Sequence, residues 1–180
     1  MNLGISRLTR FNKGGQSKSG IQRFLLNFIH GYNHKKYWKR RSIVIDPKSN
    51  TSILLKLYYL FWIKRVDASH HCSFGTNLNS GATFATPPFL PHGPNGIICG
   101  HDIKVGANCI IYHQVTIAGG NVSIGDNSEL GAGAKILPGV TIGNNCHIGA
   151  NAVVVENIPD NATCVLQKPR IIIKSKNENS

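Results

Sequence analysis

The second half of the chain repeats a pattern of six residues. From about residue 105, each unit begins with an aliphatic residue, usually follows it with glycine, and places a small residue four positions after the aliphatic one. The plainest stretch, starting at Ile124, reads IGDNSE, LGAGAK, ILPGVT, IGNNCH and IGANAV. A period of six fits neither an amphipathic helix nor a long alternating strand. It predicts short strands joined by tight turns in which Gly and Asn take the positive-φ positions.

This repeat predicts a parallel β-helix, an all-β solenoid. Three units close one triangular coil, so equivalent residues of successive coils stack at the strand spacing of about 4.8 Å. The aliphatic first residue and the small fifth residue point inward and form ladders along the axis. Such a solenoid needs caps at its ends. We therefore divide the chain into a basic, partly helical region (1–66), the β-helix (67–171) and a polar tail (172–180).

The positive charge of the chain is confined to its N-terminal third. The whole chain has 20 Lys and Arg against 8 Asp and Glu, but residues 1–66 hold 14 of the former and a single acid, Asp46. Such an excess favours nucleic acid, an anionic membrane surface or an anionic small molecule as partner. The sequence has no zinc-finger spacing, no RNA-binding aromatic motif and no recognisable helix-turn-helix. We therefore expect no nucleic-acid partner.

The most apolar run, Ile53 to Ile63, is 11 residues long and contains Lys56. It is too short to span a bilayer, which takes about 20 residues. We predict a helix, flanked by Lys64 and Arg65, that packs against the solenoid or a neighbouring subunit. The alternative is an interfacial helix that gives a peripheral membrane contact. The first 20 residues lack the apolar core of a secretory signal, so we expect a cytoplasmic protein. If the interfacial helix forms, we expect the protein at the inner face of the membrane.

The cysteines are best explained as buried structural residues. They form no CxxC pair and no Cys/His cluster at metal-ligand spacing, which favours a reduced setting and predicts no metal site. Cys109 and Cys146 take the small inward position of their units, and Cys164 does so if the register extends to Asp160. A free cysteine in such a place behaves as a small hydrophobic residue, so we expect no cysteine nucleophile. The five are Cys72, Cys99, Cys109, Cys146 and Cys164.

Two long blocks carry a family resemblance. The stretch LPHGPNGIICGHDIKVGANCIIYHQVTIAGG, followed by SIGDNSELGAGAKILPGVTIGNNCHIGANAVVVENIPDNA, resembles the serine acetyltransferase branch of the hexapeptide acyltransferases over about residues 74–171. The closing KPRII also resembles that family's C-terminal end. The resemblance implies a left-handed β-helix and a homotrimer with active sites between adjacent subunits. It also implies acetyl transfer from acetyl-CoA to a hydroxyl, without a metal.

By this resemblance, His92 matches the family's catalytic base. It would take the proton of the acceptor hydroxyl, a role that suits an imidazole with its ordinary pKa of about 6.5. His113, in IYHQVT, competes for the role because its placement resembles the catalytic His of the sugar-nucleotide and lipid A branches. Counting units puts Leu90 and Ile111 on the same face one coil apart. We therefore expect His92 and His113, each two residues further on, to share a corner.

The partner that orients the imidazole is less well defined by the sequence. The family's orienting Asp falls at Asn77 here. An Asn can fix the ring by a hydrogen bond but cannot stabilise the imidazolium with a full charge. Another acid, such as Asp102, is the alternative.

The resemblance also indicates where coenzyme A binds. The corner of the two histidines continues through Ala132 and Ala150, which by resemblance line the groove that holds the pantetheine arm. We add Gly119, in TIAGG, to this set. The nearby cations could meet the CoA phosphates, although a solvated surface role remains open for each lysine. These cations are Lys135, Lys168 and Arg170.

Two departures from the family bear on the acceptor. Serine acetyltransferases insert a long loop bearing Arg-His-Pro after TIAGG, whereas here residues 119–123 pass directly into the next unit. Residues 1–66 are also too short for the family's long helical N-terminal domain. Both features resemble shorter relatives that acetylate sugars of capsules and other surface polysaccharides. We therefore predict an acetyl-CoA-dependent O-acetyltransferase that acts on a sugar hydroxyl of a capsular or other surface polysaccharide. The basic N-terminal region would suit an anionic or lipid-linked form of this carbohydrate acceptor. Serine O-acetylation and a non-catalytic scaffold are the alternatives.

Overall fold

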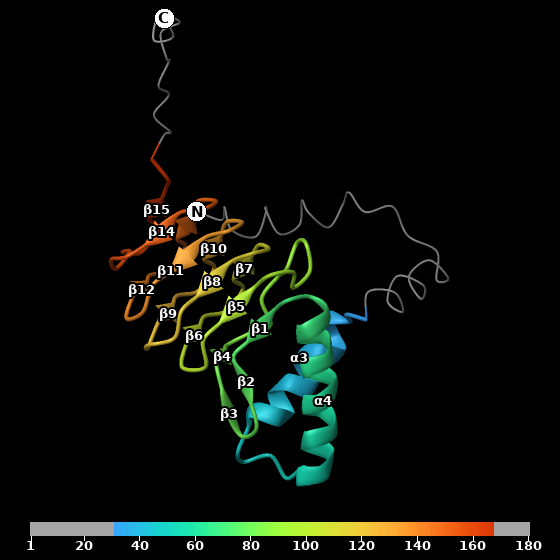
Figure 1. Ribbon diagram of the computed structural model, residues 1–180. Helices are drawn as coiled ribbons and strands as arrows, with labels where there is room; N and C mark the ends of the chain where they lie inside the picture. The colour runs from blue at the N-terminus through green and yellow to red at the C-terminus, as the bar shows by residue number, and fades with distance from the viewer. Residues whose placement is uncertain (1–30, 168–180) are drawn as a thin grey trace, which may run out of the picture.

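The computed structural model describes residues 31–167, which form two helices followed by a column of short strands (Figure 1). The helices lie at one end of the column, where the first strands begin. The predictions for Lys168, Arg170 and the tail 172–180 lie outside the described residues.

The two helices begin at polar residues that cap them. The Asn33 side chain accepts a hydrogen bond from a backbone amide in the first turn of α3 (His34–Ile45), and Ser52 does the same for α4 (Ile53–Ser69). Such caps satisfy amides that the start of a helix leaves without partners. Helix α4 confirms the helix predicted from the apolar run and extends it to Ser69. Within the described residues, no helix is long and apolar enough to cross a membrane.

The strands after α4 stack into three parallel sheets, which are the faces of a left-handed β-helix. The sheets have the orders β1-β5-β8-β11-β14, β15-β13-β10-β7 and β12-β9-β6-β4, while β2 and β3 form a small antiparallel hairpin. This confirms the predicted all-β solenoid with a helical N-terminal region. The strands are β1 (Ser73–Phe74), β2 (Thr76–Asn77), β3 (Ser80–Gly81), β4 (Thr83–Phe84), β5 (Ile98–Cys99), β6 (Lys104–Val105), β7 (Ile110–Ile111), β8 (Thr116–Ile117), β9 (Ser123–Ile124), β10 (Glu129–Leu130), β11 (Lys135–Ile136), β12 (Thr141–Ile142), β13 (His147–Ile148), β14 (Val153–Val154) and β15 (Thr163–Cys164).

Aliphatic ladders fill the interior of the column, as the six-residue period predicts. On the face formed by β7, β10 and β13, Ile111 pairs with Leu130 and Leu130 with Ile148, and all three side chains are buried. The small fifth positions are buried too, including Ser128, whose hydroxyl donates a hydrogen bond to the Gly143 carbonyl. Its burial is therefore compensated by a hydrogen bond.

One corner of the column carries a ladder of asparagines in the left-handed conformation. Asn108, Asn127, Asn145 and Asn161 all have positive φ. The side-chain NH₂ group of each of the first three donates to the side-chain oxygen of the Asn one coil further on, at 3.1 to 3.4 Å. Asn tolerates this backbone conformation better than most residues because its short polar side chain bonds locally. The prediction that Asn takes the positive-φ turns is therefore confirmed.

The last coil corrects the predicted position of Cys164. His147 pairs with Thr163 sixteen positions later, whereas Glu129 pairs with His147 eighteen positions later. The final coil is thus two residues shorter, and Cys164 pairs with Ile148 in the aliphatic ladder. The small inward position falls to Ala162, whose carbonyl accepts the His147 amide.

A buried arginine on α3 closes the first coil. Arg41 is only 2% exposed and its guanidinium donates to the carbonyls of Phe74 and Ala82 and to the Thr76 hydroxyl. Its charge also lies 5.2 Å from the Trp38 ring centroid. The planar fork of a guanidinium suits several fixed acceptors at once. Helix α3 therefore caps the solenoid through polar contacts as well as through its aromatic residues.

We predict that Arg41→Met destabilises the protein by about 3 kcal/mol or more, because it leaves buried carbonyls without donors. Arg41→Lys should recover only part of the loss, since an ammonium cannot span the same acceptors. The matched control is Lys39→Ala, an exposed change on the same helix that should stay within about 0.5 kcal/mol. Thermal unfolding followed by circular dichroism measures all three. An unchanged midpoint for Arg41→Met would contradict the capping role.

Candidate active site

Two histidines meet at one corner of the column, where the sequence places them. Phe89 bridges Ile110 in parallel, which brings the loop after residue 90 beside the next coil. The rings of His92 and His113 lie edge to face, with centroids 5.2 Å apart and an interplanar angle of 85°. The shared corner expected from the unit count is therefore present.

The loop that carries His92 is tied down at several points. The Gly96 amide donates to the carbonyl of His70, just after α4, at 3.0 Å. Asn95 holds the other side, since its side chain donates to the His92 carbonyl at 2.9 Å while its own carbonyl accepts the Gln114 amide at 2.9 Å. These bonds fix the loop against both the helical region and the next coil. The His92 ring is thus presented from an anchored backbone.

The two imidazoles differ in their surroundings. His92 is exposed, whereas His113 is half-buried and its Nδ1 atom is buried without a hydrogen-bond partner among the described residues. A buried polar atom without a partner is rare in proteins and marks a position with a possible functional reason. Of the two rings, that of His92 is the more exposed, so it is better placed to receive a proton from a bound acceptor.

The residue after His113 occupies a turn position with an unusual backbone. Gln114 has a φ of 60°, in a column that otherwise holds Gly96, Gly133 and Asn151, all with positive φ. Its carbonyl accepts the ammonium of Lys135 at 2.9 Å, and the same ammonium donates to Thr116 at 3.0 Å. A residue other than Gly or Asn is uncommon at such a positive φ. Lys135 thus braces the turn beside His113, and its predicted contact with CoA phosphate stays a prediction.

A groove of about 370 Å³ runs along the face of β10, β13 and β15 beside this corner. Ala132 and Ala150 lie on its wall, in the column that continues from His113 one and two coils further on. Tyr112 also lines it, and the Tyr112 ring centroid lies 5.9 Å from that of His92. The groove volume falls within the range of about 300 to 1,000 Å³ usual for small-molecule sites.

An imidazole and a carboxylate form another side of the groove. His147 Nδ1 lies 3.3 Å from a carboxylate oxygen of Glu129, one coil away on the same face. The pKa of Tyr112 is raised by burial first and then by the charge and hydrogen bond of Glu129. Tyr112 therefore keeps its proton near neutral pH and can donate a hydrogen bond. The groove is polar on this side and lined by small residues on the other.

The two residues considered as partners for the imidazole lie elsewhere. Asn77 is in the β2–β3 hairpin, paired with Ser80 and packed near α3, and among the described residues no hydrogen bond joins it to His92. Asp102 lies at another turn, where one of its carboxylate oxygens accepts the amides of Gly120 and Asn121. Those two bonds hold the pKa of Asp102 below its usual range. Among the described residues neither Asn77 nor Asp102 has a hydrogen bond to His92, so both orienting roles stay predictions.

Gly119 is required by the packing of this same turn. A Cβ atom on Gly119 would lie 2.9 Å from a carboxylate oxygen of Asp102. The glycine thus allows the short connection between β8 and β9 to close around the Asp102 side chain. Gly119 does not line the groove, so its predicted part in cofactor binding stays a prediction.

The cysteines carry no sign of reactivity. Four of the five are buried, and Cys164 is partly buried. Burial raises the pKa of Cys99 to about 12 and also raises that of Cys72 and Cys109. Thiols with such pKa values stay protonated near pH 7 and are poor nucleophiles. In the described part of the chain, no three of His, Cys, Asp and Glu gather where they could hold a metal ion.

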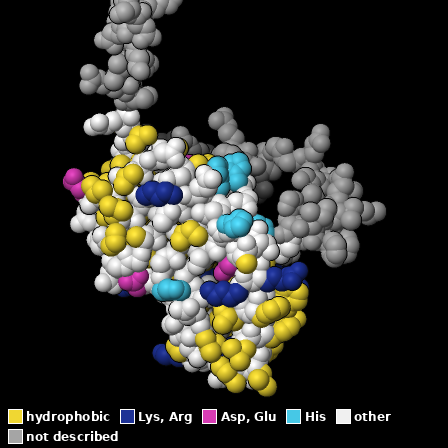
Figure 2. Space-filling model, in the orientation of Figure 1, with side chains coloured by type: hydrophobic (Ala, Val, Ile, Leu, Met, Phe, Trp, Pro, Cys, Tyr) yellow, Lys and Arg dark blue, Asp and Glu magenta, His cyan; other side chains and the backbone are white. Residues whose placement is uncertain are grey.

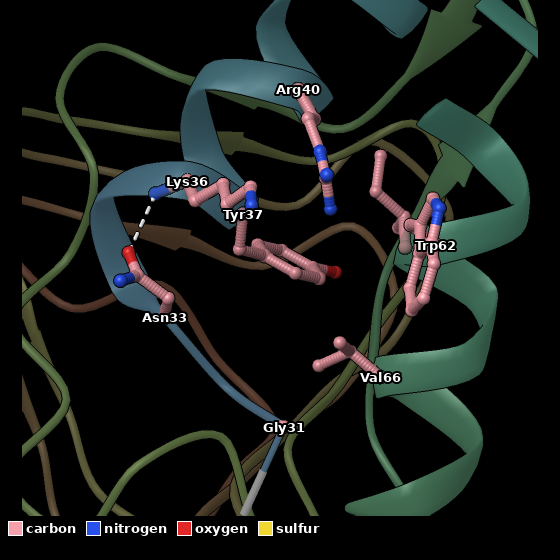
Figure 3. A pocket seen from close by; sticks show the side chains of 8 residues that line it. Gly31, Asn33, Lys36, Tyr37, Arg40, Trp62 and Val66 are labelled. Carbon is pink, nitrogen blue, oxygen red and sulfur yellow. Dashed lines mark hydrogen bonds between the residues drawn. The ribbon is translucent and has the colours of Figure 1, made fainter. Parts of the chain in front are cut away.

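A second cavity lies between α3 and α4 (Figure 3). Tyr37 and Arg40 of α3 face Trp62 of α4 across it, and the Asn33 side chain accepts the Lys36 amide at its edge. Its volume of about 30 Å³ is suited to about one water molecule. The groove beside His92 is therefore the better candidate for a substrate site.

Comparisons with known proteins agree with the fold. The family model "Bacterial transferase hexapeptide (six repeats)" matches residues 121–155. The serine acetyltransferase of Mycobacterium tuberculosis is 35% identical over 70 residues, which are 35% of this chain and 30% of that protein. The chain thus contains hexapeptide repeats and is similar to the serine acetyltransferases over about a third of its length. It spans only part of the length of these relatives.

Solved structures of serine acetyltransferases share this fold. Isoform 3 from Entamoeba histolytica, in complex with cysteine, superposes with a TM-score of 0.64 at 22% identity, over 97% of this chain and 61% of that one. A serine acetyltransferase in complex with CoA superposes with a TM-score of 0.52 at 27% identity, over 60% of this chain and 44% of that one. At 22% identity, the similarity to isoform 3 from Entamoeba histolytica concerns the fold alone.

In this serine acetyltransferase-like protein, sequence reasoning missed the polar side of the groove. Tyr112, Glu129 and His147 occupy outward positions of their units, which the repeat does not constrain. The sequence does contain a signal for this side of the groove, because residues that pair across β7, β10 and β13 share one face of the column. Glu129 and His147 are an acid and a potential base separated by one coil, so the repeat count alone could have paired them.

Proposed function

We propose that this protein is an acetyl-CoA-dependent O-acetyltransferase whose active site is the corner of His92 and His113. The observation that carries the proposal is the position of an exposed imidazole, edge to face with a second one, beside a groove of small-molecule size. The likeness to serine acetyltransferases supports acetyl-CoA as the donor, since one of those structures holds CoA. By the same resemblance we infer a homotrimer with the site between subunits.

In this mechanism His92 is the general base. It removes the proton from the acceptor hydroxyl as that oxygen attacks the carbonyl carbon of the thioester. The carbon–sulfur bond then breaks, and the His92 imidazolium returns the proton to the departing thiolate. His113 packs against His92 and is a positioning residue, because it is half-buried and its ring lies edge to face with the base. Tyr112, which keeps its proton, can donate a hydrogen bond beside the base.

We predict that His92→Ala lowers kcat by about 100-fold or more, the usual contribution of a general base. His113→Ala should have a smaller effect, since it removes support for the ring and leaves the base in place. His101→Ala is the matched control, because His101 is exposed and lies outside the groove. The rate is measured as release of CoA, and mass spectrometry checks that the acceptor is acetylated in step with that release. If His113→Ala were the more damaging change, the base would be His113.

For the acceptor, we propose L-serine first. The comparisons favour it over the carbohydrate that the sequence suggested, because the similar proteins are serine acetyltransferases. The carbohydrate stays as a second candidate on one observation. The connection between β8 and β9 is short and is bound by Asp102 at Gly120 and Asn121, so it forms no long loop over the corner.

We expect the purified protein to acetylate L-serine with a kcat/KM at least about tenfold above that for any bacterial surface polysaccharide in a panel. The physical reason is that a small acceptor can be held between the polar side of the groove and His92. Mass spectrometry of the products identifies the acetylated molecule. A preference for a polysaccharide would support the second candidate, and no CoA release with any acceptor would leave only the scaffold alternative.

The groove itself can be tested through the alanine column. Ala150→Phe fills the wall of the groove, so we predict that the KM for acetyl-CoA rises by about tenfold or more while kcat changes less. Val155→Phe is the control, because it adds similar bulk at an exposed position that does not line the groove. Steady-state kinetics at saturating acceptor separate the two parameters. An unchanged KM in Ala150→Phe would place the donor elsewhere.

A further inference from the structure

Helix α4 carries its large apolar side chains on the outside of the molecule. Leu54 is 75% exposed and Phe61, two turns further along the same side, is 60% exposed. Figure 2 shows hydrophobic side chains gathered at the end of the molecule where Figure 1 places α4, with Lys and Arg side chains beside them. We call this surface the apolar face of α4. It consists of Ile53, Leu54, Leu55, Leu57, Tyr58 and Phe61.

Buried polar side chains hold the helix in this orientation. Lys56 is 3% exposed, and its ammonium donates to the carbonyl of Asp46 at 2.7 Å and to the Asn79 side chain at 2.8 Å. Asp67, at the other end of the helix, is buried and accepts the Tyr37 hydroxyl at 2.7 Å. Turning the helix to bury its apolar face would separate both groups from their partners. Because a buried polar group that loses its hydrogen bonds is costly, the outward apolar face is a stable property of this fold.

Cations border the apolar face. Lys64 and Arg65 are exposed, seven residues after Leu57 and four after Phe61, so they lie on the same side of the helix. The Arg65 guanidinium lies 5.7 Å from the Trp62 ring centroid. Trp and Tyr beside Arg and Lys, next to exposed aliphatic residues, are typical of helices that lie in a lipid interface.

We propose that the apolar face of α4 docks on an anionic lipid surface. Leu54 and Phe61 enter the boundary between headgroups and acyl chains, while Lys64 and Arg65 bind the headgroups. This surface is independent of the acetyl-transfer site and does not require that function.

Charge favours lipid over the two other occupants of this face. A second copy of the same face would bring further cations and no acid, because residues 53–66 contain Lys and Arg but no Asp or Glu. Residues 1–30 carry Lys and Arg but no acid, so they offer these cations no counter-charge. An anionic membrane supplies both an apolar interior and the opposite charge. About 1 kcal/mol per basic residue near such a surface corresponds to about a fivefold gain in binding.

The test is flotation of the full-length protein with vesicles of phosphatidylcholine alone or of an equimolar mixture of phosphatidylcholine and phosphatidylglycerol. We expect binding to the anionic vesicles, weakened by added salt. Leu54→Gln combined with Phe61→Gln should lower the partition coefficient by about tenfold or more. Lys64→Gln combined with Arg65→Gln should also lower it, and only for the anionic vesicles.

The matched controls change similar residues elsewhere. Val155→Gln with Val165→Gln alters exposed apolar residues at the far end of the solenoid, and Lys104→Gln removes an exposed cation from it, so neither should change vesicle binding. Vesicle binding that survives both α4 variants would overturn the proposal, because it would come from another part of the chain. A change in molecular mass by light scattering in the Leu54→Gln, Phe61→Gln variant, without lipid, would instead identify the face as a contact between copies.

Discussion

The register in which successive coils stack determines where every side chain of the site lies. Ile111, Leu130 and Ile148 point inward one above another, and burial fixes their phase. Because side chains alternate between the two sides of a strand, a slip of one residue would exchange the inner and outer sets. The residues two positions after each ladder member therefore also stack, and these include His113 and Ala132. The chemistry at the corner depends on the aliphatic ladder inside it.

An enlarged coil then creates the site from this regular frame. Phe89 pairs with Ile110 twenty-one positions later, three more than the spacing between Glu129 and His147. The extra residues leave the column as a loop, which carries His92 outward beside the next coil. The loop is held by a bond from Gly96 to the end of α4. The helical region thus supports the position of the base as well as capping the column.

The sequence predicts the regular part of this arrangement and fails where regularity ends. The β-helix and the meeting of His92 with His113 follow from counting six-residue units. The count misplaces Cys164 because the last coil is two residues shorter. It gives no position for Asn77, because the β2–β3 hairpin interrupts the coils before the repeat is established. Counting units also does not identify Tyr112, because an outward position tolerates any residue and so does not contribute to the repeat pattern.

Hydropathy likewise fails to predict which side of helix α4 faces the interior. Hydropathy predicts that a run of leucines and aromatics packs inward, because burying apolar area is favourable. Here Lys56 faces inward instead, since its ammonium satisfies the Asp46 carbonyl and the Asn79 side chain. Arg41 is likewise buried against backbone carbonyls. Among the described cations of the N-terminal third, Arg41 and Lys56 therefore hold the fold together. Lys64 and Arg65 are exposed instead, and we propose that they bind an anionic surface.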